Sequence, residues 1–186
     1  MIENNLEMYF KVATWSSPIV VIFLLILSAF FSGSETALTA SSRPKLRSMS
    51  DRGSVGAKKA LDITNDNESL IGTILLGNNI VNILATSLAT AYFVKLFGDK
   101  GIFLATFCMT VLILVFSELL PKTYAINNPE TAARRVAPLV LFFIYIFSPI
   151  IIFVRKFVQL LLSLIGLKID PSKQILASDE IAGAIA

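Results

Sequence analysis

The chain has 186 residues, of which 55% are hydrophobic and only 16% are charged, whereas soluble domains carry about 25% charged residues. It contains no histidine and one cysteine. The commonest general base and transition-metal ligand is therefore missing, and disulfide frameworks and thiolate metal clusters are excluded. A net charge of +3 on so apolar a chain indicates loops beside a membrane rather than a nucleic-acid surface. The composition favours a membrane protein over a soluble enzyme.

Four nearly charge-free stretches divide the sequence, and each is close to the ~20 residues that cross the hydrocarbon core as a helix. The first carries only Glu35 and the third only Glu118. The first also lacks a positive leading flank and a small-residue cleavage site, so we expect it to remain in the mature protein. The stretches comprise residues 16–42, 69–94, 101–121 and 136–154.

The loop after the first stretch indicates the orientation in the membrane. Ser42 and Pro44 predict the start of a short helix, residues 51–53 a turn, and residues 54–63 a second short helix. By the positive-inside rule this loop is cytoplasmic and the N-terminus lies outside. The rule applies because the loop carries six cations, namely Arg43, Lys45, Arg47, Arg52, Lys58 and Lys59.

The second and third stretches predict an antiparallel pair of spans. Asp66 or Asn67 is expected to be the N-cap of the second span, which runs outward to a tight turn at residues 97–100. The third span then returns inward and is expected to end at Pro121. Residues 128–130 predict the start of a short interfacial helix.

The last apolar region, residues 136–167, permits two interpretations. A single crossing would place Arg155 and Lys156 outside, against the positive-inside rule, and Pro149 interrupts the region midway. A helical hairpin that dips into the inner leaflet satisfies both observations, and a fourth span is the alternative. We therefore expect an all-α membrane protein with three transmembrane helices, a re-entrant or interfacial hairpin, cytoplasmic juxtamembrane helices and a cytoplasmic C-terminus.

The domain organisation follows from the change in composition near the end of the chain. We expect residues 1–168 to form a transmembrane domain and the more polar residues 169–186 to be the start of a linker. The protein is expected to be multi-pass in the cell membrane, either a plasma or an inner membrane.

Polar residues at hydrocarbon depth are the best candidates for function, since burying an unpaired polar group there costs several kcal/mol. Ser28 and Ser32 share one stripe of the first span by i, i+4 spacing, and Asn78 and Asn82 share one stripe of the second. Glu118 lies about a turn inside the cytoplasmic end of the third. Hydroxyl, amide and carboxylate oxygens suit a hard cation such as Mg²⁺ or Na⁺. These five residues form the predicted metal site.

Simpler roles remain open for these and other polar residues. Any single Ser or Asn is equally explained as an interhelical hydrogen-bond partner. Glu35 lies near the inner interface, where solvation or pairing with a loop arginine competes with ligation. Lys122 is expected to reach lipid head groups, and Asn79 is expected to pack or to contact a partner subunit.

Three separated motifs carry a family resemblance: Phe31-Ser32-Gly33 with Glu35-Thr36-Ala37-Leu38, Leu76-Gly77-Asn78 with Val81-Asn82, and Glu118 with Pro121-Lys122. In these motifs, and over residues 20–165, the sequence resembles the transmembrane domain of the CNNM/CorC family of magnesium transporters. The resemblance implies a homodimer whose protomers each have three spans and a cytoplasmic-side helical hairpin. It also implies a dehydrated Mg²⁺ bound at the five residues of the predicted metal site.

The family's members resemble Na⁺-coupled Mg²⁺ exporters. Their cytoplasmic CBS nucleotide-binding domains have no counterpart in this sequence, so ATP is expected to act only through those domains. The main hypothesis is therefore Mg²⁺ export with Na⁺ as the coupling ion. The alternative is a Mg²⁺-sensing membrane regulator that moves no ions. An enzyme is the least favoured class, because no nucleophile with an adjacent base and no phosphate-binding glycine loop is found.

Overall fold

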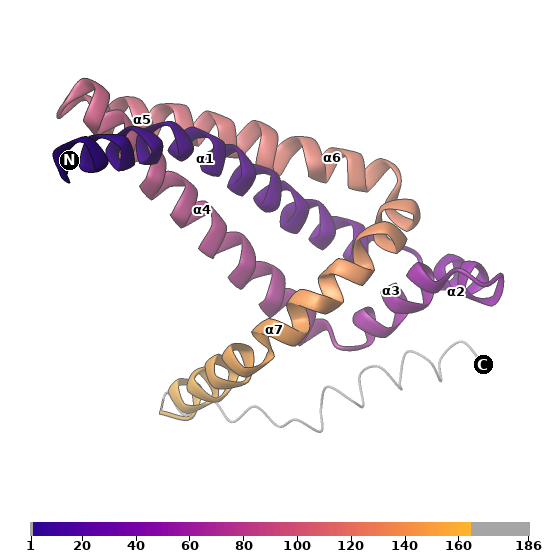
Figure 1. Cartoon of the computed structure of the whole chain (residues 1–186). Coiled ribbons are helices and arrows are strands. Elements are labelled where there is room, and N and C mark those ends of the chain that lie inside the picture. Colours follow the sequence, from indigo (N-terminus) through magenta and orange to yellow (C-terminus); the bar gives the residue numbers. More distant parts are fainter. Residues whose placement is uncertain (1, 165–186) are drawn as a thin grey trace. The chain divides into compact units, whose positions relative to one another are not determined.

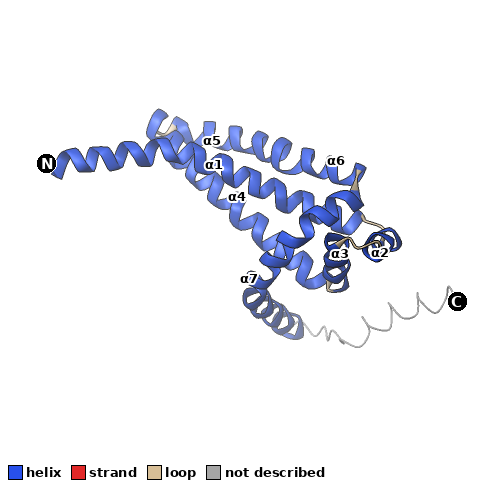
Figure 2. Ribbon diagram, turned by 45° about the vertical axis from the view of Figure 1, so that its right-hand side comes forward, coloured by secondary structure: helices blue, strands red, loops and turns tan. Residues whose placement is uncertain are grey.

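The computed structural model describes the backbone of residues 2–164 and the side chains of residues 18–164. Within that part of the chain every regular element is helical and no strand occurs (Figure 2). The predicted all-α class is confirmed. In chain order the elements are α1 (Ile2–Ala40), α2 (Arg43–Asp51), α3 (Val55–Asn65), α4 (Asn67–Phe97), α5 (Lys100–Leu112), the π-helix η1 (Ile113–Leu119), α6 (Leu120–Asn127) and α7 (Pro129–Leu164).

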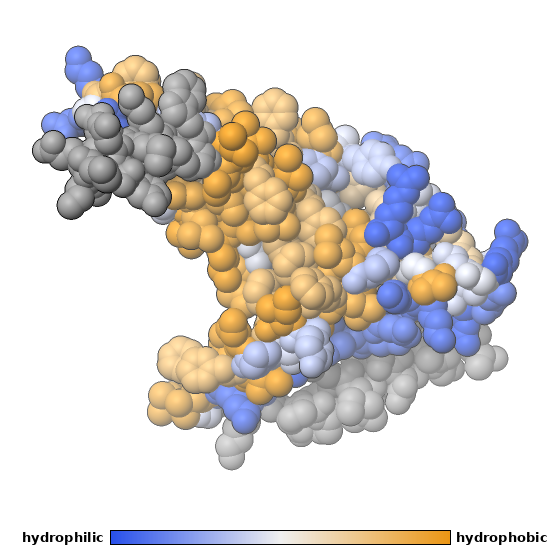
Figure 3. Space-filling model, viewed as in Figure 1, coloured by the Kyte–Doolittle hydropathy of each residue, from blue (hydrophilic) through white to orange (hydrophobic). Residues whose placement is uncertain are grey.

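Several helical segments are long and apolar enough to cross a membrane, which needs about 20 residues. Their outward side chains are apolar: Phe23, Ile83 and Phe107 are each more than 60% exposed, and hydrophobic residues dominate the face of the helices in Figure 3. A surface of this kind requires lipid rather than water. The chain is therefore a multi-pass membrane protein, and its described part has four candidate spans, Pro18–Ala40, Asn67–Phe97, Lys100–Asn127 and Pro129–Leu164.

The two short helices between the first and second spans form as predicted. Gly53 adopts φ +90° in the turn that separates α2 from α3, a conformation that glycine adopts at no steric cost. Ser54 caps α3 by accepting a hydrogen bond from the N–H of Ala57 at 3.4 Å. Asp66 caps α4 by accepting one from the N–H of Ser69 at 3.1 Å. Each cap satisfies a backbone donor that has no partner inside its helix.

The first and second spans, α1 and α4, pack against each other in opposite directions (Figure 1). The two helices come close at Gly77, where an added Cβ would lie 2.5 Å from the ring of Phe31. Phe31 is only 1% exposed and also packs on Phe143, with ring centroids 4.8 Å apart. Both helices remain regular at their glycines. Gly77 therefore permits close approach of the two helices and no local unwinding.

The third span continues beyond its expected end at Pro121. It starts after the predicted turn, in which Gly98 has φ +60°, and runs over Lys100–Asn127. Within η1 the helix widens, and the N–H of Leu120 donates to the carbonyl of Val115, five residues back. Proline lacks an N–H and crowds the carbonyl four residues before it, and a local π turn accommodates both effects. The predicted end at this proline is therefore wrong.

The last apolar region carries one long helix in the described residues. α7 begins at Pro129 and continues through Pro149 to Leu164, so the predicted hairpin within residues 136–167 is not confirmed. The short interfacial helix predicted after Asn128 is the first part of α7. An internal proline removes one backbone hydrogen bond, but membrane helices tolerate it through local adjustment. Arg155 and Lys156, whose charges argued against a single crossing, have long side chains that can extend toward the membrane interface.

Two compact units divide the chain, Met1–Phe147 and Ser148–Ala186. The first unit contains α1 to α6, the beginning of α7 and every predicted metal-site residue. The second unit is described only as far as residue 164, where it is helical and exposes apolar side chains such as Phe153. The predicted linker, residues 169–186, and its boundary at residue 168 lie outside the described residues.

Candidate ion-binding site

Three of the five predicted metal-site residues meet at one oxygen atom. The hydroxyl of Ser28 donates to Oδ1 of Asn78 at 2.8 Å, and Nδ2 of Asn82 donates to the same oxygen at 3.4 Å. Ser28 is fully buried, and the two asparagines are half-buried. We call Ser28, Asn78 and Asn82 the Asn78 cluster. The close contact of α1 with α4 one helical turn away brings these side chains together.

Two oxygens of the predicted site have no hydrogen-bond partner among the described residues. They are Oγ of Ser32, a residue only 1% exposed, and Oδ1 of Asn82. Buried polar groups are normally paired, because leaving one unpaired costs about 1–3 kcal/mol. Both atoms can accept a hydrogen bond or bind a cation. The hydroxyls of Ser34 and Thr73 are also buried without a partner in the described residues.

Glu118 is held beside α1 by its neighbour in sequence. The hydroxyl of Ser117, which is fully buried, donates to the carbonyl of Leu25 at 3.0 Å. Leu25 precedes Ser28 by three residues, which is about one helical turn. Residue 118 therefore belongs to a segment of η1 that packs at the level of the Asn78 cluster. No hydrogen bond between Glu118 and the other four predicted residues occurs in the described residues.

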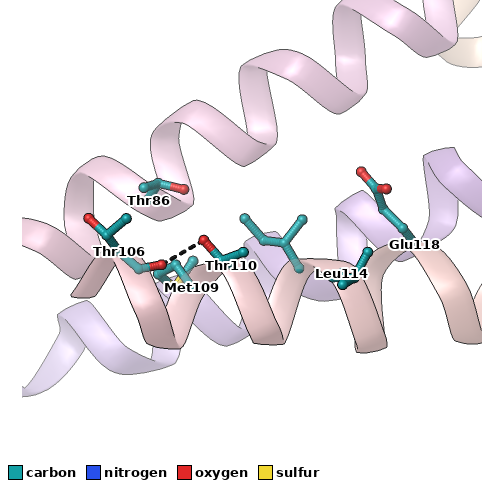
Figure 4. A pocket seen from close by; sticks show the side chains of 7 residues that line it. Thr86, Thr106, Met109, Thr110, Leu114 and Glu118 are labelled. Atoms are coloured by element: carbon teal, nitrogen blue, oxygen red, sulfur yellow. Dashed lines mark hydrogen bonds between the residues drawn. The ribbon is translucent and has the colours of Figure 1, made fainter. Parts of the chain in front are cut away.

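The side chain of Glu118 lines a cavity of about 320 Å³ between α4, α5 and η1 (Figure 4). Thr86 lies on the α4 side, one turn beyond Asn82, and the remaining lining residues come from α5 and η1. We call this cavity the threonine–glutamate groove. Its lining residues are Thr86, Thr106, Met109, Thr110, Ile113, Leu114 and Glu118.

The π turns of η1 explain why the side chains of Glu118 and Thr110 lie on the same side of their helix. Eight residues of a regular α-helix would rotate the two side chains apart by about 80°, at roughly 100° per residue. A π turn absorbs about one additional residue. Glu118 then takes the angular position of the seventh residue, which is only about 20° from Thr110. The register shift brings the carboxylate into the groove.

Glu35 is paired and lies outside this arrangement. Its Oε2 atom is 3.7 Å from Nζ of Lys122, and both side chains are more than 40% exposed. For Glu35 the sequence left solvation, pairing with a loop arginine and ligation open, and it placed Lys122 at lipid head groups. An exposed ion pair contributes about 0–1 kcal/mol to stability. No group of three or more acidic, histidine or cysteine residues that could bind a metal occurs in the described part of the chain.

Sequence reasoning missed the three threonines of the groove and the buried hydroxyl of Ser117. Thr86 follows Asn82 by four residues, and Thr106 precedes Thr110 by four. The same i, i+4 test that selected the asparagines would have found both relations. A proline four residues after Ser117 was the available signal for the altered helix.

Comparison with known proteins identifies similar membrane domains. The family described as "Cyclin M transmembrane N-terminal domain" (CNNM) matches residues 19–186. A UPF0053 protein of Haemophilus influenzae is 38% identical over 168 residues, covering 90% of this chain and 40% of the relative. The UPF0053 inner membrane protein YfjD of Escherichia coli is 37% identical over 144 residues, covering 77% of this chain and 34% of the relative.

A more distant relative carries a functional name. The polyamine export protein of Escherichia coli is 27% identical over 189 residues, covering 92% of this chain and 42% of the relative. This chain therefore spans less than half the length of each of these three proteins.

Proposed function

The chain belongs to the CNNM family of membrane domains, and from this premise we propose that it exports Mg²⁺ across the cell membrane in exchange for Na⁺. The observation that carries the proposal is the convergence of Ser28 and Asn82 on Oδ1 of Asn78. The N-terminus lies outside and the C-terminus in the cytoplasm, as the loop charges indicate. The working unit is a homodimer, and ATP acts only through cytoplasmic domains beyond this chain.

The ligand chemistry of the cluster suits a small hard cation. Mg²⁺ prefers six oxygens at about 2.0–2.1 Å and gives up its water reluctantly. Ser28 supplies a fully buried neutral oxygen and Asn78 a half-buried one, and Ser32 and Asn82 supply oxygens with no other partner in the described residues. Glu118 adds the negative charge. A site with a single carboxylate binds the ion without trapping it, which transport requires.

The hydrogen bonds within the Asn78 cluster indicate how binding proceeds. Oδ1 of Asn78 accepts from two donors, and a cation that binds this oxygen displaces them. The hydroxyl of Ser28 then turns its proton away and offers a lone pair. Mg²⁺ binding at this cluster would exchange its internal hydrogen bonds for metal–oxygen contacts.

The test is Mg²⁺ efflux from liposomes that contain only the purified chain, with an outside-to-inside Na⁺ gradient. We expect efflux from the wild type, dependence on Na⁺, and loss of efflux in Glu118→Ala and Asn82→Ala. Undiminished efflux in both variants would overturn the site. Mg²⁺ binding by the wild type without any efflux would instead favour the sensing regulator. Native mass spectrometry of the same sample measures the oligomeric state, for which we expect a dimer.

A linear polyamine is a second candidate cargo. The name of the Escherichia coli polyamine export protein suggests this substrate class. The observation on this chain that favours it is the threonine–glutamate groove, whose volume of about 320 Å³ is far larger than the roughly 10–15 Å³ of cavity space that one water molecule needs. Uptake of radiolabelled spermidine into inverted liposomes, compared with empty liposomes, tests this candidate.

A further inference from the structure

We propose that the threonine–glutamate groove binds a linear triammonium cation along its length. One terminal ammonium lies at Glu118, and the other lies among Thr86, Thr106 and Thr110. The proposal deepens the second candidate function, on which it rests, by assigning the residues that bind the cargo and the length of cargo that fits. It also makes Glu118 a shared ligand of Mg²⁺ and of the organic cation.

The polar side chains on the α5 and η1 side of the groove offer only acceptors. The hydroxyl of Thr110 donates to the carbonyl of Thr106 at 2.7 Å (Figure 4). The hydroxyl of Thr106 donates to the carbonyl of Ile102 at 2.9 Å. Each hydroxyl proton is therefore used within its own helix, and only lone pairs remain for a ligand. An ionised Glu118 likewise only accepts.

A ligand of this groove must therefore bring its own donors. An ammonium group carries three donors and no acceptor, which complements both hydroxyl oxygens and a carboxylate. No lysine or arginine lines the groove, so no side-chain cation competes for Glu118 there. Figure 4 shows the polar ends of the groove: Thr86 faces the α5 wall near Thr106, and Glu118 projects from η1 at the opposite end.

The middle of the groove is apolar. Ile113 and Leu114 line the groove between Thr110 and Glu118 in sequence, and Leu114 stands between these two residues in Figure 4. A metal ion or a hydrated ion gains nothing from such walls, whereas methylene groups are stabilised by burial against them at roughly 0.8 kcal/mol each. The order of polar end, apolar middle and polar end matches a chain of methylenes with an ammonium at each end.

The spacing of the two ends selects the length of the ligand. Eight residues separate Thr110 from Glu118, and because the π turn absorbs one of them, the rise between the two ends is about 10.5 Å at about 1.5 Å per residue. The terminal nitrogens of spermidine are nine bonds apart, and a zigzag of single bonds of about 1.5 Å extends this to roughly 11 Å. The five bonds of putrescine reach only roughly 6 Å on the same basis. A triamine bridges both ends, and the shorter diamine reaches one.

The experiment measures equilibrium binding of radiolabelled spermidine to the full chain in nanodiscs of phosphatidylcholine, which carries no net charge. We expect spermidine to bind at least tenfold more tightly than putrescine. Glu118→Gln and Thr110→Val should each weaken spermidine binding at least tenfold. The matched control is Thr90→Val, because Thr90 also donates its hydroxyl to a carbonyl four residues back, that of Thr86, at 2.8 Å but does not line the groove.

Three outcomes would overturn the groove assignment: no spermidine binding, equal binding of spermidine and putrescine, or equal loss in Thr90→Val and Thr110→Val. Mg²⁺ binding on the same samples separates this proposal from the magnesium function. Asn78→Ala should remove Mg²⁺ binding and keep spermidine binding. Absence of Mg²⁺ binding in the wild type would contradict the magnesium site and leave the groove standing, while displacement of spermidine by Mg²⁺ in the wild type supports the shared carboxylate.

Discussion

The Asn78 cluster and the threonine–glutamate groove are two polar regions of the same helical unit, and they use their hydrogen-bonding groups differently. In the cluster, donors and acceptors from α1 and α4 satisfy one another around a single oxygen. In the groove, the threonine protons on α5 are used inside their own helix, and the acceptors face a cavity. The cluster is suited to a small ion that replaces internal hydrogen bonds, and the groove to a larger ligand that brings donors.

The comparison also shows what the π-helix contributes. Ser117 points to α1 and hydrogen bonds to Leu25, while the next residue, Glu118, lines the groove. Adjacent residues on one helix point in different directions, so a single segment serves both regions. A carboxylate at this junction can balance the charge of a cation on either side.

The largest effect is expected from removing the central oxygen of the Asn78 cluster. Asn78→Ala eliminates both hydrogen bonds and leaves the hydroxyl of Ser28 buried without its partner, which costs about 1–3 kcal/mol. We expect Na⁺-driven Mg²⁺ efflux to fall at least tenfold in liposomes. Asn79→Ala is the matched control, because the side chain of Asn79 is exposed and takes no part in the Asn78 cluster. Equal loss in both variants would contradict the special role of Asn78.

The next effect tests the contact that positions the cluster. Gly77→Ala places a methyl group 2.5 Å from the ring of buried Phe31, and overpacking of this kind costs about 1–3 kcal/mol. Gly33→Ala is the milder comparison, because its nearest neighbour is Cβ of Pro121 at 3.2 Å. Thermal unfolding in detergent should give a lower midpoint for the first variant than for the second. The reverse order would mean that α1 and α4 are not held at Gly77.

A smaller effect is expected at the junction of the two regions. Ser117→Ala removes one hydrogen bond between η1 and α1, which contributes about 0.5–1.5 kcal/mol. Because this contact helps to hold Glu118, both Mg²⁺ binding and spermidine binding should weaken together, each by a few fold. Isothermal titration of the two ligands checks this. Weakening of only one of them would show that Ser117 does not position a shared carboxylate.

The smallest effect is expected at the exposed ion pair. Glu35→Gln breaks the contact with Lys122, and exposed pairs of this kind contribute about 0–1 kcal/mol. We expect wild-type Mg²⁺ efflux and a shift of the unfolding midpoint within a few degrees. A loss of efflux comparable with that of Glu118→Ala would instead show that Glu35 is a ligand, as the competing sequence interpretation proposed.

The sequence predicted the parts of the site that depend on one helix at a time. The i, i+4 relation of Asn78 to Asn82 needs only a regular helix, and the cap at Asp66 needs only local backbone groups. The hairpin is not confirmed: Pro149 was interpreted as a break, whereas α7 continues through it, as a membrane helix can absorb a proline. The threonines were missed because they carry no charge and pair within their own helices.

Composition and hydropathy by themselves determined that this is an all-helical membrane protein, which regions contain its membrane segments, and which residue types are available to bind a cation. These properties depend on the transfer of whole segments from water to lipid, which sums over residues regardless of their neighbours. Only the tertiary structure decided that Ser28 meets Asn78 and that Glu118 faces Thr110. The first contact depends on Gly77, which lets α1 and α4 pack closely, and the second on the π turn of η1, which changes the direction of the Glu118 side chain. Neither feature changes the hydropathy of the sequence, so hydropathy could not predict them.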